Sequence, residues 1–174
     1  MTARILICRA NHLSPDPRVE KEARTLAEAG YDVLALGWDR AGGLPVYEQV
    51  KGYTIQRLPI HSKNAQGLGN FPNLLRWQWS LFRWLIKHRD EFDLIHACDF
   101  DTVLPALWCQ RFHGKLVVYD IFDFYTDMLR ATPAEVKKII NWVDFQAIRL
   151  ADATIIADDA RKRQIAGSHP NRLT

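Results

Sequence analysis

The chain has 174 residues, of which 48% are hydrophobic and 25% are charged, a balance typical of one globular domain with a single core. The formal net charge of +3 is too small to indicate nucleic-acid binding by itself. No apolar run approaches the roughly 18 residues that a membrane-spanning helix needs.

The cysteines and the amino terminus both favour an intracellular protein. Cys8, Cys98 and Cys109 are odd in number and lie in or beside predicted regular elements, which is typical of reduced thiols. Residues 1–8 show no charged region followed by a long apolar stretch, so nothing marks the chain for secretion. We therefore expect a cytoplasmic protein.

Strands and helices alternate along the chain. Apolar or alternating runs predict strands at residues 4–8, 33–37, 53–58, 94–97, 115–120 and 153–157. Helical spacing predicts helices at residues 17–29, 72–89, 101–112, from 133 onward, and at 158–166. Polar connections are expected at 38–51 and 59–70, and residues 168–174 show no periodicity. The alternation predicts a Rossmann-like parallel sheet covered by helices on both faces, a three-layer α/β/α domain.

Two of these helices begin with clear signals. Asp16 precedes Pro17 as a helix-capping residue before a proline in the first helical position. Thr132 and Pro133 repeat this pattern, and Glu135 completes a capping box. Both helices should therefore start at these prolines.

The helix expected at 72–89 has an unusually wide apolar face. Its polar arc is narrow and holds Arg76, Ser80, Arg83 and Lys87; Trp77 and Trp84 lie at one edge of that arc and Trp79 at the other. Wide apolar arcs usually indicate burial between neighbouring elements. Tryptophan and basic residues also gather at membrane interfaces, so Arg76, Trp77, Arg83 and Trp84 are candidate contacts with an anionic membrane surface.

Polar side chains follow three of the predicted strands, in residues 11–18, 96–101 and 120–123. The stretch 93–104, D-L-I-H-A-C-D-F-D-T-V-L, is the most informative, because an apolar strand there delivers polar side chains just before a new helix. Open α/β sheets bind their ligands at the carboxyl ends of strands. We therefore expect the functional site at this edge.

Asp99 and Asp101 also fit a different class of enzyme. The run 99–103 matches the D-x-D-x-T/V motif of haloacid-dehalogenase-type phosphatases, and Asp158 and Asp159 imitate their final paired aspartates. In those enzymes one aspartate attacks phosphorus and others hold Mg²⁺. The same pair could be the metal-binding D-x-D of GT-A-type transferases. Both alternatives conflict with the position of the motif, which follows the fourth predicted strand.

Four segments resemble the amino-terminal half of GT-B-type retaining glycosyltransferases, the family 4-like group that includes bacterial-type sucrose and glycogen synthases and lipid mannosyltransferases. They are S-P-D-P-R-V-E-K-E-A-R-T-L-A-E-A-G-Y-D-V, D-L-I-H-A-C-D-F-D-T-V-L-P-A-L, K-L-V-V-Y-D-I-F-D-F-Y and A-D-A-T-I-I-A-D-D-A-R. The resemblance implies that residues 1–174 form one acceptor-side domain, and that the nucleotide-sugar-binding second domain is absent beyond residues 171–174. It also implies that a nucleotide sugar and a glycosyl acceptor are the partners and that no metal or cofactor is required. The chain alone is then expected to be inactive.

The resemblance assigns site residues unevenly. The family commonly shows His-x-His-Asp or His-x-His-Glu after the fourth strand, and Cys98 stands where the second histidine, a proposed active-site residue, would be. Cys98 and Asp99 are therefore the catalytic candidates, although a thiol replaces an imidazole poorly near neutral pH. The acceptor contacts implied are Asn11, His12, His96, Asp101, Asp123 and Tyr125.

The donor phosphate is expected near the start of the first helix. Many family members have a glycine-rich first loop, but residues 9–15 contain no glycine. Donor contact would then depend on Asp16, Arg18 and the amino end of that helix. Two plainer alternatives stay open: Asp16 caps the helix, and His96 is buried behind its strand. A further alternative is a Rossmann-like binding module without chemistry of its own.

The wide apolar arc and basic residues of the helix expected at 72–89 indicate where the enzyme works. Several basic residues near anionic lipid could hold a peripheral enzyme reversibly. We therefore expect a cytoplasmic enzyme at the inner face of a membrane, acting on a lipid-linked or polysaccharide acceptor.

Overall fold

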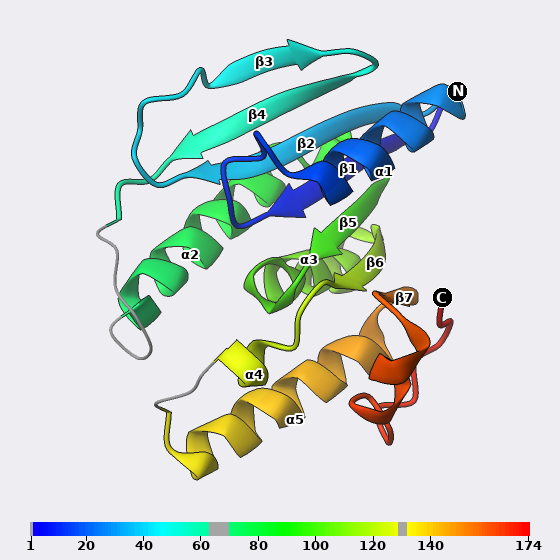
Figure 1. Cartoon of the computed structure of the whole chain (residues 1–174). Helices are drawn as coiled ribbons and strands as arrows, with labels where there is room; N and C mark the ends of the chain where they lie inside the picture. The colour runs from blue at the N-terminus through cyan, green and yellow to red at the C-terminus, as the bar shows by residue number, and fades with distance from the viewer. Residues whose placement is uncertain (1, 63–69, 129–131) are drawn as a thin grey trace.

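The computed structural model describes residues 2–62, 70–128 and 132–174, and within them a seven-stranded sheet runs through the molecule (Figure 1). The strand order is β3-β4-β2-β1-β5-β6-β7, and every pairing is parallel except that of β3 with β4. The strands are β1 Arg4–Arg9, β2 Asp32–Asp39, β3 Tyr47–Val50, β4 Tyr53–Pro59, β5 Leu94–Cys98, β6 Leu116–Ile121 and β7 Ala153–Ile156. The predicted Rossmann-like parallel sheet is confirmed.

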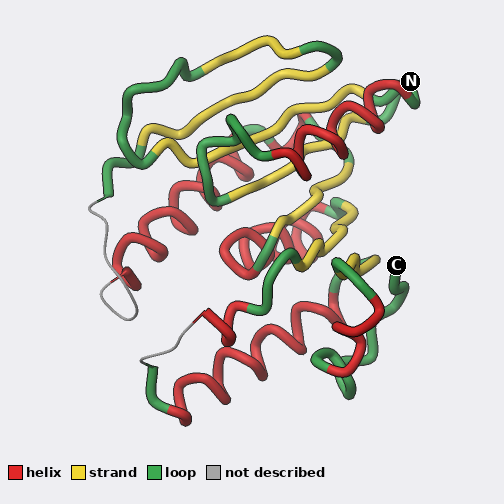
Figure 2. Tube along the Cα trace, viewed as in Figure 1, coloured by secondary structure: helices red, strands yellow, loops and turns green. Residues whose placement is uncertain are grey.

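Helices cover the two faces of this sheet unequally (Figure 2). The helices are α1 Pro17–Glu28, α2 Phe71–Lys87, α3 Phe100–His113, α4 Tyr125–Met128 and α5 Ala134–Leu150, with short 3-10 helices at Arg89–Glu91 and Asp159–Arg163. One buried cluster joins α2, α3 and α5 to one face of the sheet, and a smaller one joins α1 to the other. Figure 1 shows the same division, with α1 alone against its face of β1 and β2.

The direction in which the chain adds strands reverses beside β1. From β1 the chain passes through α1 to β2 and β4 on one side, and then returns through α2 to β5 on the other. Parallel sheets place their binding crevice at such a switch point, outside the carboxyl ends of the strands. The carboxyl ends of β1 and β5 therefore define the edge where a site is expected.

The segment 38–51 contains a strand that the sequence analysis missed. β3 pairs antiparallel with β4 at the edge of the sheet. The guanidinium of Arg57 in β4 is buried, contacts Glu48 of β3 at 2.6 Å and donates to the carbonyls of His12 and Pro45. A four-residue strand with polar residues gives little periodic signal, and the buried Arg57 contacts fix it in place.

The start of α1 is as predicted, but the start of α5 and the carboxyl-terminal segment are not. Pro133 is the capping position of α5, one residue before its first helical residue, and no capping hydrogen bond from Thr132 forms among the described residues. The helix predicted at 158–166 is only the 3-10 helix Asp159–Arg163. Residues 172–174 bond to β7 through Thr154 and Ile156, so the segment without periodicity extends the sheet. Residues 63–69 of the predicted loop 59–70 lie outside the described part of the chain.

The prediction that Trp77 and Trp84 meet a membrane is wrong. Trp77 is completely buried, stacks on Trp38 at 5.3 Å between ring centroids, and donates from Nε1 to the Asp101 carbonyl at 3.1 Å. Trp84 is also buried, beside Phe92. The inner face of α2 therefore packs on the sheet and on α3, which is why its apolar arc is wide.

A buried carboxyl group makes the stability of the fold depend on pH. Asp144 of α5 is buried and accepts a 2.6 Å hydrogen bond from the Tyr119 hydroxyl, and burial raises the pKa of this carboxyl to about 6. The unfolded value is about 3.9. Between these values the folded state holds a proton that the unfolded state releases, so the free energy of unfolding falls as pH rises.

We therefore expect Asp144→Asn, which keeps an acceptor for Tyr119, to have a higher free energy of unfolding than the wild type at pH 7, by about 2–3 kcal/mol. The difference should disappear near pH 4. Denaturant unfolding at both values measures it, with the exposed Asp90→Asn as control. A pH-independent difference would contradict the assignment.

Candidate functional site

Asp99 holds together the carboxyl ends of β5 and β6. Its backbone N–H donates to the Asp120 carbonyl at 2.9 Å. Its Oδ1 accepts from the backbone N–H groups of Phe122 at 2.8 Å and Asp123 at 3.2 Å. Its Oδ2 forms an ion pair with Arg9 at the end of β1. With both oxygens engaged, Asp99 positions the loop after β6.

The backbone of Asp99 shows that this arrangement is imposed by the tertiary structure. Asp99 has a φ of 64°, in the left-handed region that side-chain-bearing residues rarely adopt. Such conformations persist only where surrounding contacts determine them, and they cluster at functional sites. The turn from β5 into α3 is therefore built around this residue.

Asp16 performs the capping role that the sequence left open. Its Oδ1 accepts from the backbone N–H of Val19 at 3.2 Å, the bond of a helix cap. Its Oδ2 accepts from Asn11 at 2.7 Å and from Arg9 at 3.2 Å. Arg9 therefore links the starts of α1 and α3 through Asp16 and Asp99. Asp16 has no free carboxylate oxygen, so a direct contact with a donor phosphate is not expected from it.

Asp101 is the carboxylate at this edge that lacks a partner. It lies in the first turn of α3, and its Oδ1 is buried without a hydrogen-bond partner in the described ranges. Burial, followed by the nearby negative charge of Asp99, raises the pKa of Asp101 to about 6, while Arg40 and Arg9 oppose the rise. A buried acceptor without a partner is costly, and a ligand hydroxyl would satisfy it.

Asp123 and Tyr125 follow β6 at the same edge. Asp123 is largely exposed and accepts from Arg161 at 3.1 Å. Tyr125 packs against Phe100, with ring centroids 5.2 Å apart. Because Asp123 N–H donates to Asp99, the loops after β5 and β6 share one edge. The structure therefore brings Asp99, Asp101 and Asp123 together.

A groove of about 540 Å³ opens beside the loop after β1. Asn11 and His12 line it, as does Arg40, whose guanidinium carbon lies 4.0 Å from the centre of the Trp38 ring. Gly37 permits the close approach of this loop to β2, because a Cβ there would lie 2.7 Å from the Asn11 carbonyl oxygen.

Sequence reasoning missed Arg9 and Arg40 as site residues. Each comes at or just after the carboxyl end of its strand, β1 or β2, and this position was the available signal. Arginine presents several rigid donors to carboxylates, phosphates and sugar oxygens. Both are therefore added to the candidate site.

His96 and Cys98 do not line this edge, which corrects two predictions. Both side chains are buried, and Cys98 packs in the cluster beneath α1. Side chains two apart on a strand share a face, and these two share the α1 face. Cys98 cannot touch an acceptor at the edge, and the His96 ring faces Asp120 at 3.1 Å.

Arg18 is already engaged by protein carboxylates. Its guanidinium contacts Asp120, donates to Glu22 at 3.1 Å, and lies 3.9 Å from the centre of the Phe122 ring. A donor phosphate would have to compete with these partners. The guanidinium carbon of Arg9 lies 4.2 Å from the centre of the same Phe122 ring, and Arg9 forms its ion pair with Asp99.

The fold of this chain is similar to the folds of several solved structures. Sucrose-phosphate synthase of Thermosynechococcus elongatus gives TM-scores of 0.73 and 0.74 in two structures, at 13% identity over 98% of this chain. The chain covers 86% of the shorter structure and 47% of the longer one. A UDP-glucosyltransferase from Polygonum tinctorium gives 0.61, at 9% identity over 99% of this chain and 51% of its own. The chain thus spans about half the length of these two longer proteins.

Sequence comparison gives the family directly. No curated protein matches the chain. The model of the glycosyl transferase 4-like domain matches residues 15–172, which is nearly the whole chain. The chain belongs to the glycosyl transferase 4-like domain family, with the fold of the amino-terminal half of GT-B glycosyltransferases.

Proposed function

We propose that this chain is the acceptor-side domain of a retaining glycosyltransferase, which moves a sugar from a nucleotide-sugar donor to an acceptor hydroxyl. A second, nucleotide-sugar-binding domain of the same protein would complete the enzyme. The observation that carries the proposal is the buried Oδ1 of Asp101 at the switch-point edge, which has no hydrogen-bond partner among the described residues and lies near Arg9 and Arg40. Family membership supports the reaction class.

The edge offers the contacts that an acceptor needs. The Asp101 and Asp123 carboxylates accept hydrogen bonds from sugar hydroxyls, each contributing about 1.5–3 kcal/mol when charged. Arg40, His12 and Asn11 supply donors along the groove beside the loop after β1. Asp99 acts as a positioning residue, since it holds the backbone of 122–123 without reaching the acceptor.

The transfer itself needs no metal in this proposal. The acceptor hydroxyl oxygen bonds to the anomeric carbon on the same face from which the diphosphate departs, as the bond from that carbon to the phosphate oxygen breaks, so the configuration is retained. The nucleoside diphosphate leaves with the electron pair, and the hydroxyl proton is released. Basic side chains and a helix amino terminus can stabilise the leaving diphosphate.

Acceptor binding and transfer test the proposal separately. Saturation-transfer NMR of the 174-residue chain with a panel of glycosides should detect binding of an acceptor, and Asp101→Asn should weaken that binding. The chain alone should not turn over a nucleotide sugar, whereas the protein extended by its second domain should. Binding without transfer in the extended protein would indicate a non-catalytic binding module. Mg²⁺-dependent hydrolysis of p-nitrophenyl phosphate, abolished by Asp99→Asn, would instead indicate the phosphatase.

We also propose that this domain rests on an anionic membrane through an aromatic row formed by Trp79 and Phe82 of α2 with Trp108 and Phe112 of α3. Neighbouring rings in this row lie 5.5, 4.7 and 4.7 Å apart, and a groove of about 440 Å³ runs beside it. Trp79 is 60% exposed. The exposed Arg76, Arg83 and Arg111 lie on the same two helices. Within the described ranges, no helix has the length and apolar character needed to cross a membrane.

We expect the protein to sediment with phosphatidylglycerol-containing vesicles at low salt and to be released as salt rises, because the charge attraction is screened. Arg76→Glu with Arg83→Glu should weaken binding by more than about tenfold, at about 1 kcal/mol for each basic residue removed. Trp79→Ala with Phe82→Ala should also weaken it. Trp142→Ala is the control, since Trp142 has a similar exposure of 63% but lies on α5, outside the aromatic row. Binding that survives both double variants would exclude this surface.

A further inference from the structure

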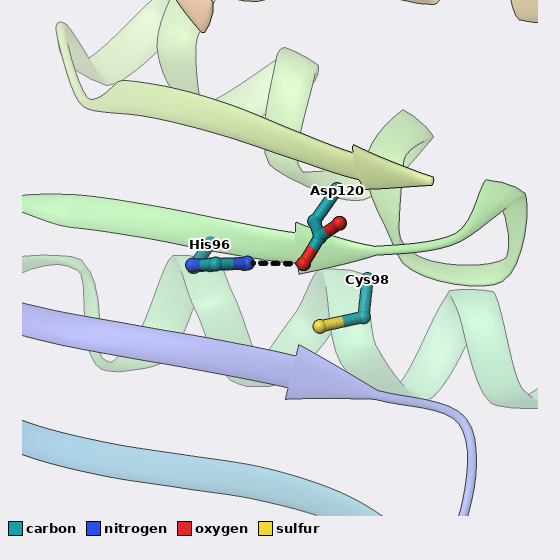
Figure 3. Close-up of side chains that lie close together, drawn as sticks. All are labelled: His96, Cys98 and Asp120. Carbon is teal, nitrogen blue, oxygen red and sulfur yellow. Dashed lines mark hydrogen bonds and ion pairs between the residues drawn. The ribbon is translucent and has the colours of Figure 1, made fainter. Parts of the chain in front are cut away.

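Potential metal ligands gather beneath α1, on the face of the sheet opposite α3. Nε2 of His96, Sγ of Cys98 and a carboxylate oxygen of Asp120 all lie within 4.8 Å of one another. Figure 3 shows the imidazole, thiol and carboxylate turned toward one another at the carboxyl ends of β5 and β6. All three residues are buried. The register explains the cluster, because Cys98 pairs with Asp120 and lies two residues after His96.

Glu22 of α1 adds a carboxylate beside His96. Oε2 of Glu22 lies 3.6 Å from Nε2 of His96 and is buried with no hydrogen-bond partner in the described part of the chain. Oδ2 of Asp120 lies 3.1 Å from the same nitrogen. Two carboxylate oxygens therefore converge on one imidazole nitrogen.

Arg18 orients both carboxylates from outside. It contacts Oδ1 of Asp120 and donates to Oε1 of Glu22 at 3.1 Å, so it takes one oxygen of each group. The other oxygen of each group is left facing His96. Partners that fix the orientation of ligating carboxylates in this way are a regular feature of metal sites.

We propose that Glu22, His96, Cys98 and Asp120 bind one Zn²⁺ ion, which ties α1 to β5 and β6. Zn²⁺ takes nitrogen, sulfur and oxygen ligands in tetrahedral geometry, with ligand atoms about 3.4–3.7 Å apart for the usual bond lengths. The pairs at 3.1 and 3.6 Å are already close to this spacing. The Cys98 sulfur lies within 4.8 Å of the other ligand atoms of His96 and Asp120. Mg²⁺ and Ca²⁺ prefer sites made only of oxygen ligands.

Charge favours a divalent cation here. Two carboxylates and one guanidinium leave the buried cluster with an excess negative charge when the thiol and imidazole are neutral. A thiolate together with a divalent ion brings the cluster to neutrality. A groove of about 660 Å³ lined by Arg18, Glu22 and His96 gives the ion a path of entry.

Cobalt(II) titration of the reduced 174-residue protein tests the site, because Co²⁺ substitutes for Zn²⁺ and reports a thiolate ligand by a near-ultraviolet charge-transfer band. We expect the band to saturate at one equivalent, to be removed by Zn²⁺, and to be lost in Cys98→Ser. Glu22→Gln should retain the band and bind more weakly, by about tenfold or more. Cys109→Ser is the matched control, since Cys109 is a buried thiol packed on the other face of the sheet.

Circular dichroism of each variant establishes that it is folded. If Cys98→Ser does not fold, Glu22→Gln carries the test, because glutamine has nearly the size and shape of glutamate and removes only the charge. Absence of the band in the wild type, or its persistence in folded Cys98→Ser, would overturn the proposal. If the wild type and Glu22→Gln bind Co²⁺ with equal affinity, Glu22 is not a metal ligand. None of these results depends on glycosyl transfer, so the site can fail without affecting the proposed function.

Discussion

Trp77→Ala is expected to lower the free energy of unfolding by about 3–5 kcal/mol, the range for removing a large aromatic side chain from a packed core. Trp77 is completely buried and stacked on Trp38 with an interplanar angle of 2°. Its indole N–H also donates to the carbonyl of Asp101, so the substitution leaves that acceptor unpaired. Urea unfolding followed by circular dichroism measures the loss.

Trp79→Ala is the matched control, two residues along the same helix. Trp79 is 60% exposed, and substitutions at such surface positions usually change the free energy of unfolding by less than about 0.5 kcal/mol. The two variants separate the two surfaces of α2. Trp77→Ala should lower the free energy of unfolding, whereas Trp79→Ala should weaken vesicle binding. Equal destabilisation by the two substitutions would contradict the packing described for α2.

Asp99→Ala is expected to cost about 3–5 kcal/mol of stability, the range for breaking one side of a buried ion pair. It removes the partner of Arg9 and the acceptor for the backbone N–H groups of Phe122 and Asp123. It also places alanine at a φ of 64°, which favours residues with local hydrogen bonds or glycine. Thermal and urea unfolding both report the change.

Asp99→Asn should recover part of this loss. An amide oxygen can still accept from the two N–H groups, but the charge facing Arg9 is lost. Asp93→Ala is the control, because its ion pair with Arg4 is exposed and such pairs contribute about 0–1 kcal/mol. If Asp99→Ala cost no more than Asp93→Ala, Asp99 would not organise the edge.

The positioning role of Asp99 changes how the D-x-D pattern is understood. From the sequence, Asp99 was a catalytic candidate and Asp101 an acceptor contact, and their spacing also suited a metal-binding pair or a phosphatase. In the structure Asp99 is occupied by Arg9 and backbone groups, whereas Oδ1 of Asp101 has no partner among the described residues. The two residues therefore have different surroundings, and the proposed acceptor contact falls to Asp101.

The sequence by itself determined the fold class and the location of the site. Strand runs such as residues 4–8 and 115–120, alternating with helical segments, required a parallel sheet, because periodicity depends only on neighbouring residues. The capping pattern of Asp16 and Pro17 also fixed the start of α1 correctly. Polar residues after strands located the edge, since the carboxyl ends of parallel strands lie together.

Only the tertiary structure decided which side chains reach that edge. Cys98 and Asp99 are adjacent in sequence, yet one is buried beneath α1 and the other bonds to the loop after β6. The wheel of α2 could not distinguish Trp77 from Trp79 as core or surface, because that depends on where Trp38 and α3 lie. The same holds for Glu22, which meets His96 and Asp120 only after α1 packs on the sheet. Contacts between residues distant in sequence are set by packing, which local patterns do not encode.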